Sequence, residues 1–129
     1  RREYAPVPPI MVDRHKLLQI LVNLLSNARH ALLEVARPDK LLTLRISAQP
    51  RGRLWLQVAD NGVGIAPEHL PRIFAQGFTT KKDGHGFGLH ASALAANDMN
   101  GNLTCASPGV HQGATFTIEL PLTSEQASS

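Results

Sequence analysis

Residues 14–36 follow a helical pattern in which polar and apolar positions occupy separate arcs. At about 100° per residue, five polar side chains fall within one arc of about 80°, namely Gln19, Asn23, Asn27, His30 and Glu34. Six leucine and isoleucine side chains fill the adjoining arc, which we expect to be buried, namely Leu17, Ile20, Leu21, Leu24, Leu25 and Leu32. Asp13 is a suitable N-cap, and Pro38 ends the pattern. A helix of this kind must bury one side in a core while another side lines something polar.

The rest of the pattern supplies a sheet for this helix to pack on. Stretches of alternating apolar and polar residues indicate strands, and glycine, proline and asparagine mark the turns between them. In chain order, we expect two strands, a short helix, a longer helix and two strands at residues 41–49, 54–59, 67–74, 87–99, 103–107 and 114–120. This order predicts one α+β domain with its helices on one face of a sheet.

Composition excludes several classes of function. The 129 residues are 43% hydrophobic and 18% charged, which is typical of one globular domain. No apolar run reaches the roughly 18 residues that span a bilayer, and no signal peptide is visible. The single cysteine, Cys105, excludes an internal disulfide and fits a reducing cytoplasm. A net charge of +3, scattered basic residues and 5% aromatics give no nucleic-acid-binding surface.

Asn23 and Asn27 are one turn apart in an otherwise apolar helix, where asparagine is unfavourable by propensity. One interpretation is that this arc is simply solvated. The functional interpretation is that the amide oxygens meet a hydrated Mg²⁺, which prefers oxygen ligands.

Residues 60–65 carry an Asp-Asn-Gly-x-Gly pattern directly after a strand. Gly62 and Gly64 permit a positive φ or a close approach of the backbone to a flat ligand. Asp60 can accept a hydrogen bond from an exocyclic amine such as that of adenine. The alternative is an ordinary turn at the end of a strand.

Residues 84–88 form a second glycine-bearing segment, which runs into a helix. Bare amides at a helix N-terminus suit phosphates. The glycine spacing matches neither a Walker loop nor the dinucleotide fingerprint. Hydroxyls and cations precede this segment, at Thr79, Thr80, Lys81 and Lys82. They could meet a triphosphate, and the alternative is a solvated basic loop.

Together these segments resemble the GHKL ATPase superfamily, and within it the catalytic, ATP-binding domain of bacterial sensor histidine kinases. The N box, first glycine box, F box, second glycine box and closing strand resemble residues 23–28, 60–64, 74–78, 84–89 and 113–121. The resemblance covers about residues 10–121. It implies a two-layer α/β sandwich of the Bergerat type, with a mixed sheet covered by about three helices, ATP between the helices, and a mobile lid over residues 75–85.

The resemblance also implies roles for individual residues. Asn27 would ligate Mg²⁺, with Asn23 beside it near the phosphates, and Asp60 would bind the adenine amine. Thr115 would sit near the adenine, and Lys81 would join the two asparagines in catalysis. The further residues expected at the nucleotide are His30, Gly62, Gly64, Ile65, Phe78, Thr79, Thr80, Lys82, Gly84, Gly86, Phe87, Gly88 and Leu89.

Three positions depart from the family pattern. His30 stands three residues after Asn27, where these kinases often have lysine, and either His30 or the preceding Arg29 could neutralise phosphate. His85 replaces the usual threonine of the second glycine box, and His90 replaces the usual serine after Leu89. We interpret His85 and His90 as subfamily variation rather than as catalytic residues.

Asn23 indicates the type of reaction. Superfamily members that hydrolyse ATP usually carry a glutamate at this position to activate water, and an amide cannot act as that base. Glu34 lies on the same helix face but roughly 16 Å further along the axis. We therefore expect phosphoryl transfer to a protein acceptor, catalysed by positioning and charge neutralisation.

None of the six histidines fits the acceptor motif of such kinases. We expect the acceptor on a separate dimerisation domain, with residues 1–12 leading in from it, residues 13–121 forming the catalytic domain and residues 122–129 a disordered tail. The domain is expected to be cytoplasmic and monomeric, in a full-length protein that can be membrane-anchored, and to serve a response regulator indirectly. The alternatives are an anti-sigma-factor-type serine kinase and a non-catalytic nucleotide-binding docking module.

Overall fold

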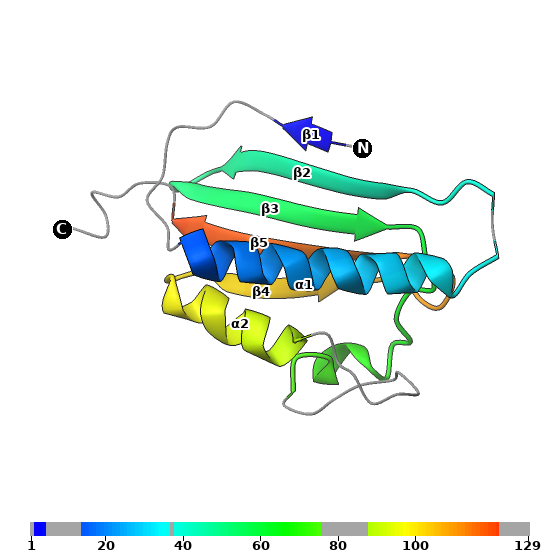
Figure 1. Cartoon of the computed structure of the whole chain (residues 1–129). Helices are drawn as coiled ribbons and strands as arrows, with labels where there is room; N and C mark the ends of the chain where they lie inside the picture. The colour runs from blue at the N-terminus through cyan, green and yellow to red at the C-terminus, as the bar shows by residue number, and fades with distance from the viewer. Residues whose placement is uncertain (1, 5–13, 37, 76–87, 122–129) are drawn as a thin grey trace.

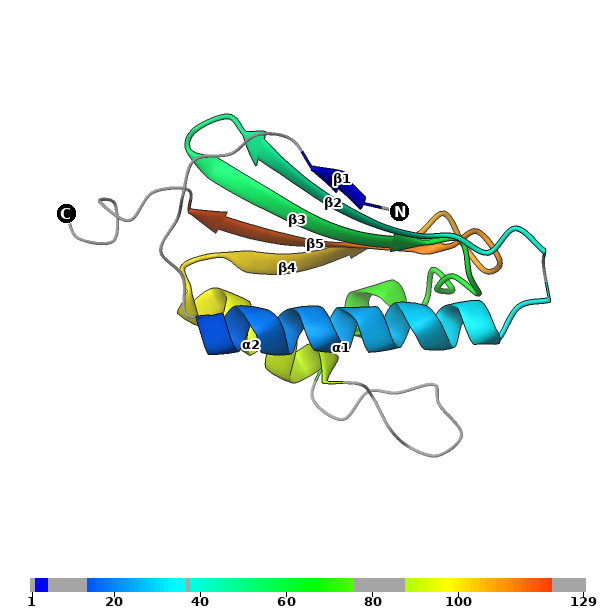
Figure 2. The same cartoon turned by 45° about the horizontal axis from the view of Figure 1, so that its top comes forward.

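The computed structural model describes residues 2–4, 14–36, 38–75 and 88–121. In chain order its elements are β1 (Arg2–Tyr4), α1 (Arg14–Leu33), β2 (Leu42–Gln49), β3 (Arg53–Asp60), the 3₁₀ turn η1 (Leu70–Arg72), α2 (Leu89–Asp98), β4 (Asn102–Ala106) and β5 (Ala114–Pro121). The strands form one sheet, and α1 and α2 both cover the same face of it (Figures 1 and 2). The predicted α+β fold with two layers is confirmed.

The sheet has five strands in the order β1-β2-β3-β5-β4. β1 runs parallel to β2, and the other neighbouring pairs are antiparallel, so the sheet is mixed, as predicted. Of residues 1–12, which we expected to lead in from a separate domain, residues 1 and 5–12 lie outside the described residues. The lead-in nevertheless supplies the edge strand, through Arg2–Tyr4.

Period-two alternation builds the core. In β5, Phe116, Ile118 and Leu120 point to the helix layer and are buried, while the residues between them are half-buried on the other face. The buried side of α1, with Ile20 and Leu24, packs on this surface.

No helix in the described ranges is long and apolar enough to cross a bilayer.

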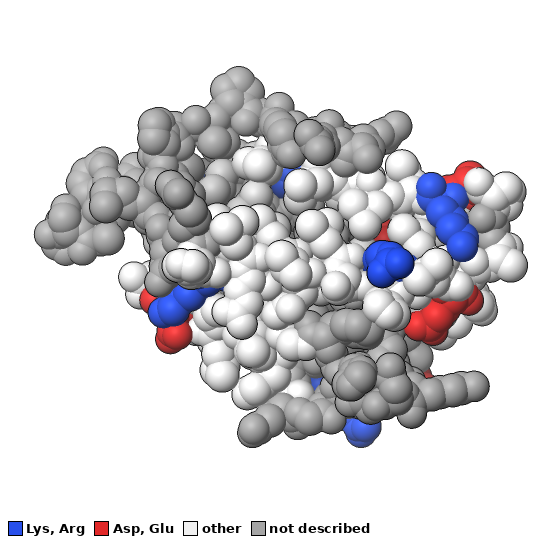
Figure 3. Space-filling view, in the orientation of Figure 1, with Lys and Arg blue, Asp and Glu red and all other residues white. Residues whose placement is uncertain are grey.

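The helix α1 has three faces rather than two. Besides the buried arc and the arc with the two asparagines, Leu18 and Val22 turn to solvent, 53% and 60% exposed. Leu25, which we placed in the buried arc, is 36% exposed beside them. In Figure 3 the face of the molecule over α1 accordingly shows few charged side chains.

The short helix expected over residues 67–74 is only a 3₁₀ turn. His69 donates to Ala66 O at 2.9 Å and Arg72 donates to His69 O at 2.8 Å, both of which are three-residue steps. Pro71 has no N–H with which to bond the carbonyl four residues earlier, so an α-helical ladder cannot pass through it. Over the residues that the structure describes, the helix layer therefore consists of two α-helices and this turn, where we expected about three helices.

Candidate functional site

Asn23 joins α1 to the first turn of α2. Its Nδ2 donates to Ser92 Oγ at 3.0 Å, and Ser92 is only 1% exposed. Gly88 has a φ of 69°, and a Cβ on Gly88 would lie 2.6 Å from Asn23 Nδ2. The fold thus brings the asparagine of the first helix against the end of the second glycine segment. Asn27 lies one turn further along α1, half-buried.

The first glycine segment rests on the other end of α1. Val63 N donates to Ala31 O at 3.0 Å, and a Cβ on Gly62 would lie 2.6 Å from the backbone of Ala31. Gly64 has a φ of 74°, and a Cβ there would overlap the carbonyl oxygen of Gly109. Within the described residues, glycine is therefore required at both positions by close contacts with the protein's own backbone.

Asp60 ends β3 with its carboxylate turned toward the helix layer. Its Oδ1 accepts a hydrogen bond from Gly62 N at 2.8 Å, and its Oδ2 is buried. Burial, and secondly the charge of Asp60, raise the pKa of the Cys105 thiol on β4 from 9.0 to about 12. Asp60 lies two positions beyond the buried Val58 on β3, so strand alternation places its carboxylate on the helix side of the sheet.

Ser107 fixes the first glycine segment to the β4–β5 connection. Its Oγ accepts from Ile65 N at 3.1 Å and donates to Gly113 O at 2.7 Å. Gly109 also bonds this hydroxyl, through its N at 3.3 Å. Ser107 was not among the residues predicted from the sequence. A serine at a strand end directly before Pro-Gly was the available signal.

Two histidines expected near the site are hydrogen-bonded to backbone carbonyls. His30 Nδ1 lies 2.9 Å from Ser26 O in its own helix. His90 Nδ1 lies 2.9 Å from Phe74 O, sixteen positions away in the sequence. A carbonyl only accepts, so Nδ1 carries the proton in both rings. Among the described residues, no three His, Cys, Asp or Glu side chains are grouped to hold a metal.

Comparison with known proteins identifies the family. The family model for histidine kinase-, DNA gyrase B-, and HSP90-like ATPases matches residues 12–124. The chain belongs to this family. The superfamily predicted from the asparagine and glycine segments is therefore confirmed.

Sensor kinases are among the similar proteins. The two-component sensor PprA of Pseudomonas aeruginosa is 41% identical over 124 residues, covering 92% of this chain and 13% of PprA. The sensor histidine kinase ZraS of Salmonella typhimurium is 35% identical over 128 residues, covering 91% of this chain and 24% of ZraS. The chain therefore spans a quarter or less of these relatives.

Solved structures agree on the fold. The catalytic domain of histidine kinase ThkA has a TM-score of 0.81 at 25% identity, covering 97% of this chain and 79% of that one. Full-length ShkA in complex with AMPPNP has a TM-score of 0.75 at 31% identity, covering 93% of this chain and 25% of that one.

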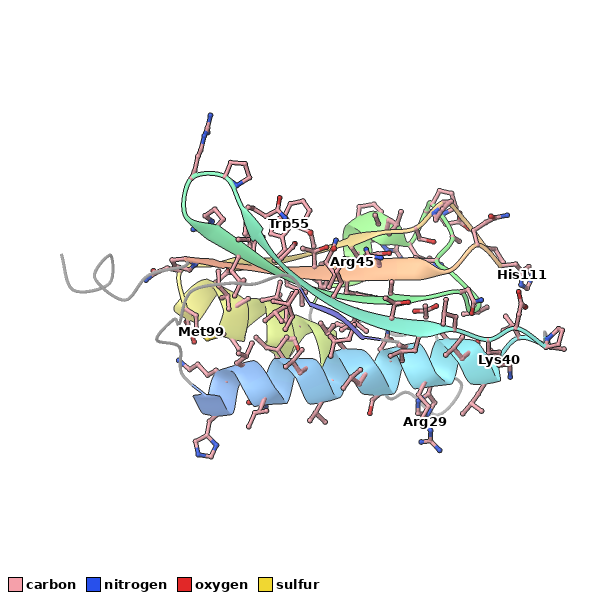
Figure 4. All side chains as sticks on the ribbon, turned by 90° about the horizontal axis from the view of Figure 1, so that it is seen from above. Arg29, Lys40, Arg45, Trp55, Met99 and His111 are labelled. Carbon is pink, nitrogen blue, oxygen red and sulfur yellow. The ribbon has the colours of Figure 1, made fainter. Side chains whose placement is uncertain are left out.

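One expected contact in this ATPase-family domain needs correction. Thr115 pairs with Ala59 between two positions, Ala114 and Phe116, that point to the helix layer. Its side chain therefore lies on the opposite face of the sheet from Asp60, the face that carries Arg45 and Trp55 (Figure 4). Thr115 cannot line a pocket between sheet and helices, and Ala114 occupies the inward position.

Several expected contacts of the ATPase-family domain lie outside the described residues. They are Phe78, Thr79, Thr80, Lys81, Lys82, Gly84, Gly86 and Phe87. Of the described candidates, Asn23 and Gly88 meet at one place, and Asp60, Gly62, Gly64 and Ile65 share one connected segment.

Proposed function

We propose that this domain binds ATP with Mg²⁺ and donates the γ-phosphoryl group to a histidine on a separate dimerisation domain, in two-component signalling. The observation that carries this proposal is the hydrogen bond from Asn23 Nδ2 to Ser92 Oγ at 3.0 Å. It holds an amide, not a carboxylate, between α1 and the start of α2. An amide cannot deprotonate water, so this position supplies no general base for hydrolysis. Phosphoryl transfer needs positioning and charge neutralisation instead.

The described residues suit a nucleotide at both ends. At the base end, the inward-facing carboxylate of Asp60 is an acceptor for the adenine amine. At the phosphate end, α2 begins directly after Gly88. Because glycine has no side chain, it cannot cap the first backbone amides of α2, and they stay available to an anion. By family resemblance, the backbone amides of Gly88 and Leu89 bind the phosphates.

The amide oxygen of Asn27, on the same arc of α1 as Asn23, is the proposed ligand of Mg²⁺. The bound ion supplies neutralisation of the phosphate charge. Lys81 remains the proposed further cation.

We infer that the acceptor histidine and the dimer contacts belong to the rest of the kinase. This is in keeping with the small share of PprA and ZraS that the chain covers. The isolated domain is then a monomer, and a response regulator receives the phosphoryl group only from the acceptor histidine. We place the domain in the cytoplasm, where ATP is available.

The test is transfer between separate proteins. The domain is mixed with the dimerisation domain of the same kinase, Mg²⁺ and γ-labelled ATP. The label should enter the dimerisation domain in an acid-labile, base-stable form typical of phosphohistidine, and none should enter this chain. Release of free phosphate without acceptor would contradict the proposal. An acid-stable label on a serine-bearing antagonist would favour the serine kinase, and no binding of ATP would favour the docking module.

A further inference from the structure

His90 connects the first turn of α2 to the segment after η1. It is the second residue of α2, half-buried, and its Nδ1 donates to Phe74 O at 2.9 Å. The residue usual in related kinases at this position is serine, whose hydroxyl lies one bond closer to the backbone. The imidazole reaches a carbonyl from a different part of the fold.

The carbonyl that His90 holds is anchored in the core. The ring of Phe74 meets the ring of Phe116 edge to face, with centroids 6.2 Å apart and planes at 83°. Phe116 is 1% exposed in the centre of β5, and Ile73 next to Phe74 is buried. The position of the Phe74 carbonyl is therefore set by the packed sheet.

The opposite side of the same helical turn is held by α1. Ser92 follows His90 by two residues, which is about 200° around the helix, and accepts the hydrogen bond from Asn23. Gly88 packs against that asparagine as well. The first turn of α2 is thus fixed from two sides, by Asn23 and by the His90 link to Phe74.

We propose that His90 is a positioning residue, which holds the first amides of α2 in the place where they meet the nucleotide phosphates. This inference rests on the proposed function. His90 acts through the backbone of α2 and touches neither base nor phosphate. Loss of its hydrogen bond therefore weakens the binding of the phosphates and leaves the adenine end unchanged.

The test compares three variants, His90→Ala, His90→Asn and His90→Gln, with wild type. Calorimetry gives the dissociation constants for ATP with Mg²⁺ and for adenosine. In His90→Ala the constant for ATP should rise about fivefold to tenfold, while that for adenosine should change less than about twofold. Asparagine places its Nδ2 where the imidazole has Nδ1, so His90→Asn should restore ATP binding to within about twofold. Glutamine places its nitrogen further out and should not.

His15→Ala is the matched control, since His15 is exposed in the first turn of α1, and it should bind like wild type. Unchanged ATP binding in His90→Ala would overturn the inference and leave the proposed function standing. An equal loss for ATP and adenosine, or equal rescue by asparagine and glutamine, would also overturn it, because a general packing role predicts both. Failure of wild type to bind ATP would overturn the proposed function and the inference together.

Discussion

The amide nitrogen of Asn23 lies 3.0 Å from the hydroxyl of Ser92, and this bond joins two helices across 69 positions of sequence. It orients the Asn23 side chain, because the amide nitrogen donates to Ser92 and the oxygen must then point elsewhere. A residue predicted to face phosphate is therefore held by a contact within the protein.

Asp60→Asn should weaken ATP binding by about 10-fold to 100-fold, because a charged acceptor for the adenine amine becomes a neutral one of the same shape. Calorimetric titration of ATP with Mg²⁺ measures the change. Asp98→Asn is the control, since the ion pair of Asp98 with Lys16, at 3.5 Å, is exposed. Equal affinities for Asp60→Asn and wild type would remove Asp60 from the base pocket.

Gly88→Ala should lower the free energy of unfolding. A non-glycine residue in the left-handed conformation costs roughly 1–2 kcal/mol, and the loss should exceed this because the new Cβ would also clash with the side chain of Asn23. Urea unfolding without nucleotide measures this loss. In an Asn23→Ala background the steric part disappears, so the cost of Gly88→Ala should fall to about 1–2 kcal/mol. The same cost in both backgrounds would show that the two residues are not coupled.

Ser107→Ala should destabilise the domain by about 1–3 kcal/mol, because Ile65 N and Gly113 O lose their shared partner. Urea unfolding gives the size of the effect. Ser47→Ala removes a serine that accepts one bond from Gln49 on the outer sheet face, and it should cost less than about 1 kcal/mol. Similar losses in the two variants would argue against a special role for Ser107.

The Cys105 thiol should resist alkylation in the folded domain. Its pKa rises from 9.0 to about 12, chiefly through burial and then through Asp60, and three units lower the thiolate fraction about a thousandfold. Iodoacetamide at pH 8 should therefore label urea-unfolded protein far faster than folded protein. Equal rates would contradict the raised pKa.

The same shift makes stability depend on pH. Between about pH 9 and about pH 12 the unfolded thiol loses its proton while the folded thiol keeps it, so the free energy of unfolding should fall as pH rises. Cys105→Ala should lack this part of the decline, which a comparison of denaturation curves across that range would reveal.

Local patterns were sufficient for most of the secondary structure. The long helix was expected over residues 14–36 and spans Arg14–Leu33, and β3 was expected over residues 54–59 and spans Arg53–Asp60. Periodicity is a property of neighbouring residues, so the sequence displays it directly. The prediction of a short α-helix over residues 67–74 was wrong, because Pro71 interrupts the α-helical hydrogen bonds within that stretch.

The candidate site was predicted less completely, for a physical reason. The requirement for glycine at position 88 comes from Asn23 in another helix, and the role of Ser107 comes from Ile65, 42 positions away. Such contacts exist only after folding. Thr115 was misplaced because it was assigned by resemblance. Because side chains alternate along a strand, Ala114 lies on the same inner face of the sheet as Phe116, and Thr115 lies on the outer face.

The strand order has a consequence for synthesis of the protein. β5 is the last strand in the chain, yet it lies between β3 and β4 and contributes Phe116, Ile118 and Leu120 to the core. Until residues 114–121 leave the ribosome, β3 and β4 have no common neighbour, and the core that includes Ile20 and Leu24 of α1 lacks the buried side chains of β5. The nascent domain therefore exposes a free edge of β3, a free edge of β4 and an apolar helix face until β5 has emerged, and the five-stranded sheet cannot form before then.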